Sequence, residues 1–340
     1  MKRIITFGEV MMRLCPEGYL RFIQSNKWDV SYAGGEANVA ASLAQFGMEA
    51  AFVSKVPSHE IGQCAVNELR RFGVDTSLVI REGERLGTYY VEKGASQRAS
   101  KVIYDRAYSA IALAKPEEFN WKKIFSGASW FHFTGITPAL SDNMAEACGE
   151  AVKTAGEMGI PVSCDLNFRK KLWSGEKAGK VMGEILPFVD ICIANEEDAA
   201  DVFGIRAKGS DIGKGELRRE GYVSVARQIC RRFGCKKTAI TLRGSISASD
   251  NNWSGMLYEK GEAFFAPNYL IHIVDRVGGG DSFAAGLIYS QLSLWDNQKS
   301  INFAVAASCL KHSIEHDFNL VTVAEAETLA AGNASGRVQR

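Results

Sequence analysis

The stretch Asp275-Arg276-Val277-Gly278-Gly279-Gly280-Asp281-Ser282-Phe283-Ala284-Ala285-Gly286 decides how this chain is interpreted. Three consecutive glycines lead into small and apolar residues that are typical of a buried helix. Glycines let backbone N–H groups converge on one point, and the first turn of a helix adds N–H groups without partners in the helix. The helix dipole adds partial positive charge at the same end. Gly278, Gly279 and Gly280 are therefore predicted to form an anion hole suited to phosphate.

Asp281 follows these glycines directly and admits two interpretations. A carboxylate beside an anion hole can take a proton from a substrate hydroxyl while phosphate charge develops against the backbone N–H groups. Alternatively, Asp281 only caps the helix and the glycines only form a tight turn. This segment by itself leaves both interpretations open.

Outward from this segment, apolar runs of strand length alternate with amphipathic runs of helix length. We predict strands at 3–14, 50–56, 130–134, 161–166, 190–194 and 237–242, and helices at 36–46, 61–72, 142–158, 178–186, 197–203, 223–233, 281–292, 300–314 and 323–331. This alternation predicts an α/β fold with a mostly parallel central sheet and helices on both faces. We expect one domain over 1–331, a surface loop at 207–221 and a flexible tail at 332–340.

Two segments interrupt the alternation. Residues 21–32 and 86–108 look like strands without a helix between them, and Gly94-Ala95-Ser96-Gln97 between two such runs indicates a hairpin. We expect these strands, about 15–33 and 86–108, to form a small separate sheet that acts as a lid. Exposed strand edges of such a lid favour pairing between subunits, so a homodimer or a higher homo-oligomer is expected.

The composition of the chain argues against several classes of protein. The 340 residues are 46% apolar and 23% charged, and 40 basic against 39 acidic residues give a net charge of +1. We therefore expect neither nucleic acid nor a membrane as partner, because both favour a basic excess. The acidic Glu9 in the first apolar run argues against a secretion signal. The eight cysteines are sparse, and Cys164 and Cys192 look like reduced core residues, so we expect a cytoplasmic protein.

Two motifs together resemble the signatures of the ribokinase-like (PfkB) carbohydrate kinases. Residues 275–281 resemble the signature Asp-Thr-x-Gly-Ala-Gly-Asp, and residues 34–47, which begin Gly-Gly-Glu-Ala-Asn-Val-Ala, resemble Gly-Gly-x-x-x-Asn-x-Ala. The resemblance covers nearly the whole chain and implies an ATP-dependent sugar kinase with a β-sheet lid. The chain has neither a Gly-x-x-x-x-Gly-Lys-Ser/Thr loop nor a Gly-x-Gly-x-x-Gly after its first strand, which argues against P-loop and Rossmann enzymes.

Within this family the chain most resembles kinases of 2-dehydro-3-deoxygluconate, a sugar acid. The resemblance implies a substrate site made of Gly34, Gly35, Asn38, Tyr89, Tyr104, Arg106, Arg169, Asp281 and Asp317. An arginine matches a carboxylate or phosphate with two parallel hydrogen bonds, so Arg106 and Arg169 are candidates for the acid group or the transferred phosphate. Neutral-sugar kinases of the family often have aspartate at the position of Arg13, and its loss also favours an acid substrate.

Several of these residues have simpler explanations. Tyr89 and Tyr104 fit a cross-strand pair that stabilises the hairpin as well as they fit substrate contacts. Arg106 also fits a surface position on the lid, Arg169 a loop salt bridge, and Asp317 an ordinary residue at the end of a helix.

The resemblance also implies nucleotide and metal contacts. Asn195, Thr241, Arg243, Gly244, Gly278 and Gly280 are expected around ATP, with a polar loop at 245–254 after the turn at 241–244. Asn195 and Asp198 are expected to support Mg²⁺ through water, as Mg²⁺ retains several waters in proteins. Asp198 replaces the family's glutamate, and Val305 stands where relatives place a polar residue near adenine, so only apolar packing is expected there.

Three functions fit these observations. The first is phosphorylation of 2-dehydro-3-deoxygluconate at its terminal hydroxyl, with Asp281 as the base, Gly278–Gly280 as the anion hole and Arg169 on the transferring group. The second is the same chemistry on a neutral ketose such as fructose or on another small alcohol. The third is a sugar sensor that kept the fold, although a sensor has no use for the proton acceptor at Asp281.

Overall fold

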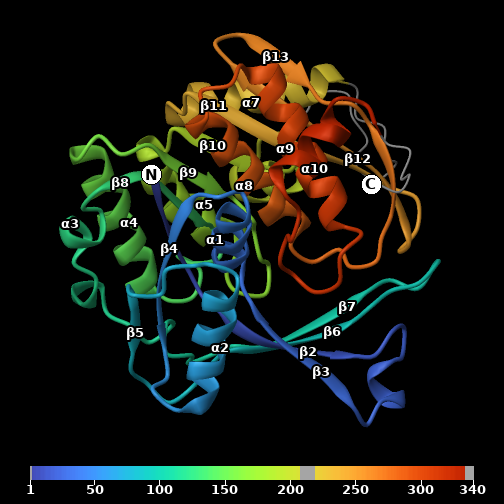
Figure 1. The fold of residues 1–340 in the computed structure, drawn as a ribbon. Helices are drawn as coiled ribbons and strands as arrows, with labels where there is room; N and C mark the ends of the chain where they lie inside the picture. The colour runs from blue at the N-terminus through green and yellow to red at the C-terminus, as the bar shows by residue number, and fades with distance from the viewer. Residues whose placement is uncertain (1, 207–218, 334–340) are drawn as a thin grey trace.

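Alternate residues of the central strands are buried on opposite faces of one sheet, as the side-chain period of a strand requires. In the first strand, Ile4 packs into one apolar core and Ile5 into the other. The computed structural model, which describes residues 2–206 and 219–333, shows this sheet running through the middle of the molecule (Figure 1).

The central sheet of the described residues has ten strands in the order β13-β12-β11-β10-β9-β8-β1-β4-β5, with β14 paired to β12. From β11 to β5 all neighbouring strands are parallel, and the pairs that β12 forms are antiparallel. The strands are β1 (Arg3–Phe7), β4 (Glu49–Val56), β5 (Val79–Arg81), β8 (Ala128–Thr134), β9 (Val162–Asp165), β10 (Ile191–Ala194), β11 (Lys237–Ser245), β12 (Asp250–Glu259), β13 (Glu262–Phe265) and β14 (Tyr269–His272).

Helices cover both faces of this sheet. Residues of five helices pack into one core, namely α1 (Gly35–Gln45), α2 (Glu60–Arg71), α8 (Gly279–Leu292), α9 (Asn297–Lys311) and α10 (Val323–Ala330). The other core receives α3 (Trp121–Ile124), α4 (Asp142–Glu157), α5 (Gly175–Ile185), α6 (Glu196–Phe203) and α7 (Arg219–Phe233). Short 3₁₀ helices lie at Phe22–Gln24, Pro116–Glu118 and Leu186–Phe188. The predicted α/β class with helices on both faces is confirmed.

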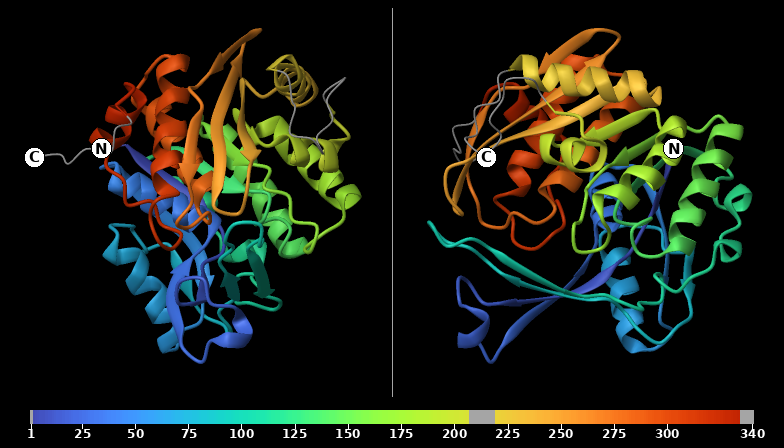
Figure 2. Two further views of the ribbon diagram at one scale, coloured as in Figure 1. Left: turned by 90° about the vertical axis from the view of Figure 1, so that its right-hand side faces the viewer. Right: turned by 180° about the vertical axis from the view of Figure 1, so that it is seen from behind.

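A second sheet of four strands projects from one end of the molecule (Figure 2). Its order is β3-β2-β6-β7, with β2 (Met11–Pro16), β3 (Trp28–Ala33), β6 (Thr88–Glu92) and β7 (Lys101–Asp105). We call these four strands the lid sheet. The hairpin predicted around Gly94–Gln97 joins β6 to β7, where Ser96 has φ +53°. The separate sheet predicted from the two irregular segments is therefore present.

Three local predictions are wrong. The single strand at 3–14 is two strands in different sheets, β1 and β2, which Gly8, Glu9 and Val10 connect. A side chain at Gly8 would collide with the buried Glu36 carboxyl. The strand at 21–32 is a 3₁₀ turn followed by β3. The polar loop at 245–254 is mostly strand, because β11 extends to Ser245 and pairs with β12 in a long antiparallel register.

The remaining predictions concern the cysteines, one loop and the C-terminal tail. Cys164 and Cys192 are buried without disulfides, as predicted. The loop predicted at 207–221 and the tail predicted at 332–340 lie mostly outside the described residues, and the residues from Arg219 onward form α7. In the described ranges, no helix is long and apolar enough to span a membrane.

Candidate active site

The glycine turn precedes α8 and needs glycine for two different reasons. Gly278 is the N-cap of α8 with φ +84°, and a side chain there would also collide with the carbonyl oxygen of Asp317. A side chain at Gly279 would collide with the ring of His312. Gly280 faces open space. The turn is thus shaped by the residues packed behind it and open on the other side.

The start of α8 leaves backbone donors available. Within 2–206 and 219–333, no acceptor lies within hydrogen-bond range of the N–H groups of Gly280 or Asp281. Unpaired N–H groups at a helix start carry partial positive charge. The geometry is that of an anion-binding turn.

Asp281 does not cap the helix. Its carboxylate accepts a hydrogen bond of 2.6 Å from the side-chain amide of Asn38, and no side chain caps α8. Asn38 in turn accepts from the backbone N–H of Gly34 at 3.3 Å. A side chain at Gly34 would collide with the carbonyl of Glu9, and one at Gly35 would contact Asp281. The two motifs found in the sequence therefore meet at one carboxylate.

Burial raises the pKa of Asp281 to about 7. The hydrogen bond from Asn38 opposes this shift, whereas the charges of Asp317 and Glu36 add to it and Arg169 lowers the pKa. Glu36 is fully buried, and its carboxyl accepts hydrogen bonds from Thr134 and Thr137. A carboxyl whose pKa lies near neutrality can accept and release a proton at physiological pH.

The carboxylate of Asp317 binds two side chains of the lid sheet. Its carboxylate accepts from Arg13 at 2.5 Å and from the Tyr89 hydroxyl at 2.7 Å. Arg13, which is 1% exposed, also donates to Asp275 at 2.5 Å. Asp317 is therefore not an ordinary residue at a helix end. Because Asp275 and Asp317 hold this guanidinium, Arg13 itself offers no free charge to a sugar acid, and only the absence of an aspartate at this position still favours an acid substrate.

Arg106 is neutralised in the same way. Its Nε donates to Glu9 at 2.7 Å, and Ser109 donates to the other oxygen of that carboxylate at 2.5 Å. Tyr89 and Tyr104 lie directly opposite each other in β6 and β7 with ring centroids 6.1 Å apart, so they are a cross-strand pair. Both also line the pocket in front of Asp281, so the two explanations for them are compatible.

Carboxyl groups gather where β9 and β10 end. Burial raises the pKa of Asp198 to about 7 and that of Asp165 well above its usual range, and Asp198 and Asp281 raise the pKa of Asp165 further. Arg169 lowers the pKa of all three carboxyls. Open parallel sheets bind ligands at this edge. Asn195 accepts from the N–H of Asp198 and caps α6, and Asp198 accepts from the N–H of Phe168.

Direct metal coordination is not supported by the described residues, which contain no group of three or more acidic, histidine or cysteine side chains able to hold an ion. A magnesium ion that retains its waters needs only indirect support from carboxylates. Asp165 and Asp198 fit that requirement, because a cation nearby would favour their charged forms.

The residues predicted to form a turn on the nucleotide side of the site do not form one. Thr241, Arg243 and Gly244 lie within β11 and pair with β12, so they form no turn. The guanidinium of Arg243 stacks over the ring of Trp253 at 5.4 Å. Val305 is fully buried, which agrees with the apolar packing expected for it.

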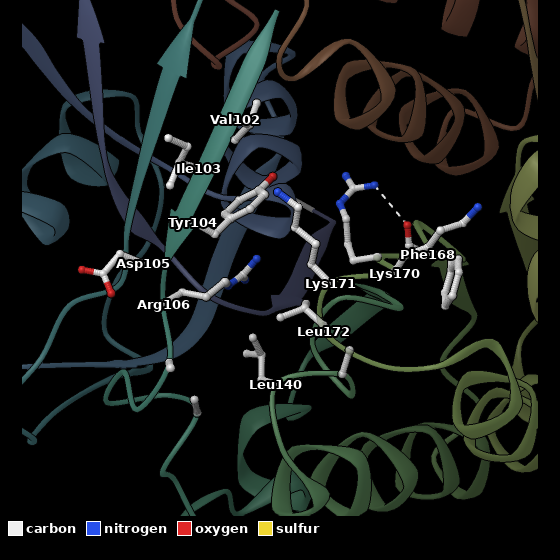
Figure 3. Close-up of a pocket in the computed structure, with 14 residues that line it drawn as sticks. Val102, Ile103, Tyr104, Asp105, Arg106, Leu140, Phe168, Lys170, Lys171 and Leu172 are labelled. Carbon is white, nitrogen blue, oxygen red and sulfur yellow. Dashed lines mark hydrogen bonds between the residues drawn. The ribbon is translucent and has the colours of Figure 1, made fainter. Parts of the chain in front are cut away.

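Two neighbouring cavities lie at this edge of the sheet, and Asp281 lines the smaller one. The inner one, of about 70 Å³, is lined by Asp281, Asp317, Tyr89, Asn38, Gly34 and Gly35 among others. The outer one, of about 710 Å³, lies between β7 and the loop after β9 (Figure 3). Tyr104, Arg106 and Arg169 line both cavities. The outer volume is in the range of small-molecule sites.

A family model for the pfkB family carbohydrate kinases matches residues 1–313. The chain belongs to this family. The crystal structure of 2-dehydro-3-deoxygluconokinase from Thermotoga maritima is 50% identical, with a TM-score of 0.94 over 97% of this chain and 98% of that one. The 2-dehydro-3-deoxygalactonokinase of Haloferax volcanii is 31% identical over 333 residues, which are 98% of each chain. A structure described as a ribokinase II of E. coli, solved with ATP and Mg²⁺, has a TM-score of 0.81 at 18% identity over 97% of this chain and 99% of that one, which shows the shared fold.

This PfkB sugar kinase thus brings together most of the residues predicted from its sequence. Gly34, Gly35, Asn38, Tyr89, Tyr104, Arg106, Arg169, Asp281 and Asp317 all line the inner cavity. The remaining predicted residues line neither cavity, namely Asn195, Asp198, Thr241, Arg243, Gly244, Gly278, Gly279 and Gly280. Sequence reasoning missed Glu9, Glu36, Asp165 and Lys171, although Glu9 ends the first apolar run and Glu36 lies inside the first motif.

Asp281→Asn tests the environment of this carboxyl in the kinase without any substrate. The native state holds a proton on Asp281 up to about pH 7, whereas an unfolded aspartate releases it near pH 3.8. Wild-type stability is therefore lost as pH rises through this window, and the variant avoids that loss. We expect the variant to exceed wild type by about 2 kcal/mol or more at pH 8, since one pKa unit is worth about 1.4 kcal/mol.

Urea unfolding of both proteins at pH 5 and pH 8 measures this difference, with the exposed Asp29→Asn as control. The gain should grow from pH 5 to pH 8 in Asp281→Asn only. An equal gain at both pH values would show that the pKa of Asp281 is not raised.

Proposed function

We propose that this kinase transfers the γ-phosphate of ATP to the terminal hydroxyl of 2-dehydro-3-deoxy-D-gluconate. One observation carries the proposal: Asp281 is a buried carboxyl with a pKa of about 7, at the start of α8 and in the wall of the inner cavity. Asp281 directly follows the three glycines in the sequence, so the proposed proton acceptor lies next to the proposed anion-binding N–H groups.

The reaction follows from this geometry. Asp281 takes the proton of the sugar hydroxyl as that oxygen attacks the γ-phosphate in line. The free N–H groups at Gly280 and Asp281 and the glycine turn hold the charge that develops on the phosphate. Arg169, which lines both cavities, steadies the transferring group. Closure of the lid sheet over the sugar excludes water, which would otherwise accept the phosphate.

ATP and Mg²⁺ are the proposed cosubstrate and ion. The E. coli ribokinase II structure contains both, and the buried carboxyls of Asp165 and Asp198 suit a hydrated divalent cation. When bound, Mg²⁺ would neutralise phosphate charge. We place the nucleotide beyond the glycine turn, with Asn195, Thr241, Arg243 and Gly244 on its side of the site.

The acid group of the substrate belongs in the outer cavity. The inner cavity has the carboxyls of Glu9, Glu36, Asp281 and Asp317 in its wall. Arg106 and Arg169 line both cavities, and the outer cavity adds Lys170 and Lys171. The carboxylate in its wall, Asp105, is paired with Arg85. Lys170 pairs with Asp201 at 2.9 Å, whereas no carboxylate pairs with Lys171 in the part of the chain that the structure describes. Figure 3 shows Lys171 pointing toward Tyr104 of the lid sheet.

2-Dehydro-3-deoxygalactonate is the second candidate substrate. The Haloferax relative, which matches nearly the whole chain, carries the name of this sugar acid's kinase. The two sugar acids share the carboxylate and the terminal hydroxyl, so the same base and cationic cavity serve both.

ATP-dependent phosphorylation of the two sugar acids, fructose and ribose tests the function. We expect turnover of an acid, with kcat/KM falling about tenfold per pH unit below pH 7 as Asp281 becomes protonated. Asp281→Asn should lower kcat about 10²- to 10⁴-fold. Preferred turnover of a neutral sugar would remove the acid assignment, activity retained in Asp281→Asn would remove the base, and no turnover of any sugar would favour a sensor.

Lys171→Gln tests the placement of the carboxylate. Losing a charged hydrogen bond to the substrate should raise KM for the sugar acid about tenfold while kcat changes little. The matched control is Lys170→Gln in the same loop, whose charge is already paired with Asp201. Equal KM values for the two variants would place the carboxylate elsewhere.

We further propose that the lid sheet forms a homodimer. Val30, Leu14, Tyr90 and Ile103 lie in one register across its four strands, and Val30 and Ile103 are 53% and 51% exposed. An exposed apolar row of this kind is typical of an interface. The same face in a second copy would cover it.

Val30→Asp should convert the dimer to a monomer, because it places a charge in the middle of the apolar row. Light scattering after size exclusion measures the mass of the particle. The control is Leu294→Asp, which introduces the same charge at a residue that is 86% exposed and lies outside the lid sheet. A monomeric wild type, or a dimeric Val30→Asp, would exclude this interface.

A further inference from the structure

The last turn of α9 packs behind the glycine turn. The hydroxyl of Ser308 donates to the carbonyl of Gly279 at 2.6 Å. The carbonyl of His312 accepts from the N–H groups of Val274 and Asp275 at 2.8 and 3.3 Å. The backbone on both sides of the turn is thus fixed by this one helix end.

A lysine lies at the centre of this contact. Lys311, the last residue of α9, is fully buried, and its ammonium donates to the carbonyls of Asp275 and Ile314 at 3.3 and 3.2 Å. Lysine is almost never fully buried unless it is paired. The hydrogen-bond partners of the Lys311 ammonium are thus two uncharged backbone carbonyl groups, whose dipoles favour a positive charge between them.

The surrounding charges balance only if Lys311 is protonated. Asp275 and Asp317 are buried and share Arg13, which leaves one negative charge over. Burial lowers the pKa of Lys311 below its ordinary value, and the charges of Asp275, Asp317 and Asp281 oppose this shift. With Lys311 charged, two cations face two anions, so the protonated form satisfies the cluster.

We propose that Lys311 is a positioning residue whose buried ammonium acts as a built-in cation for the glycine turn. By holding the carbonyl of Asp275, three residues before Gly278, it fixes the direction in which the turn presents its N–H groups. Its charge also removes the excess negative charge that would oppose a phosphate beside Asp281. The proposal rests on the kinase function proposed above.

If Lys311 acts as a cation, a variant that leaves its space open should respond to added cations, whereas a role in packing alone predicts no such response. Lys311→Ala leaves a space lined by carbonyl oxygens, which are the ligands that replace the hydration shell of a potassium ion. Potassium or ammonium should therefore occupy this space and restore the turn. Lys311→Met fills the space with apolar atoms of similar length and should respond to no cation.

The experiment measures kcat and the melting temperature in potassium, ammonium or tetramethylammonium chloride at equal ionic strength. In tetramethylammonium, we expect both variants to lose about tenfold or more in kcat, with KM for the sugar less affected, since removing one donor from an anion hole costs 10²–10³-fold. Potassium and ammonium should restore Lys311→Ala saturably and raise its melting temperature, because a ligand bound only to the native state stabilises it.

The control is Lys299→Ala on the same helix, where the lysine is exposed and pairs with Glu327. It should respond to no cation, and neither should the wild type. The proposal is overturned if wild type requires potassium, or if Lys311→Ala is fully active in tetramethylammonium. It is also overturned if no cation refolds or reactivates Lys311→Ala. A wild type inactive on every sugar would instead contradict the proposed function, while the melting temperatures would still test the cation site.

Discussion

The hydrogen bond between Asn38 and Asp281 is the contact on which the site depends. It joins residues 243 positions apart, one on α1 and one on α8, at 2.6 Å. Both helices pack into the same core, and Gly34 and Gly35 let α1 start close enough to reach Asp281. The bond orients the carboxylate away from its own helix, so the N–H groups of that helix stay available for an anion. Burial of the same carboxyl is what brings its pKa near neutrality.

Charge, more than shape, divides the site into two parts. In the inner cavity, acidic groups are either paired, as Glu9 and Asp317 are, or have raised pKa values, as Glu36 and Asp281 do. Arg169 brings positive charge to both cavities, and Lys171 adds a further positive charge in the outer one. An acidic sugar therefore has one favourable orientation, with its carboxylate outward and its hydroxyl toward Asp281. A neutral sugar has no electrostatic reason to choose that orientation.

The sequence predicted the elements and the two motifs because these are local patterns. Alternating apolar runs located most strands and helices within a few residues, and the glycines located the start of α8. The break between β1 and β2 was missed because apolar residues resume at Val10, two residues after Gly8, and the partners that the two strands take in different sheets come from other parts of the chain. The partners of Arg13 and Arg106 could not be predicted either. Asp317 is 304 positions from Arg13, and Glu9 is 97 from Arg106, so only the fold pairs them.

The hydrogen bonds that Asp317 accepts connect the lid sheet to the glycine turn. Arg13 on β2 and Tyr89 on β6 both belong to the lid sheet, and both end on Asp317. The carbonyl of that residue lies against Gly278, so the lid sheet and the anion turn share one support. Arg13 extends the link to Asp275, and Lys311 holds the carbonyl of the same residue. In a buried network, displacing one charged member leaves the others unsatisfied, which costs several kcal/mol. The inner strands of the lid sheet are therefore tied to the glycine turn, so a movement of the lid sheet over a sugar would also act on the turn.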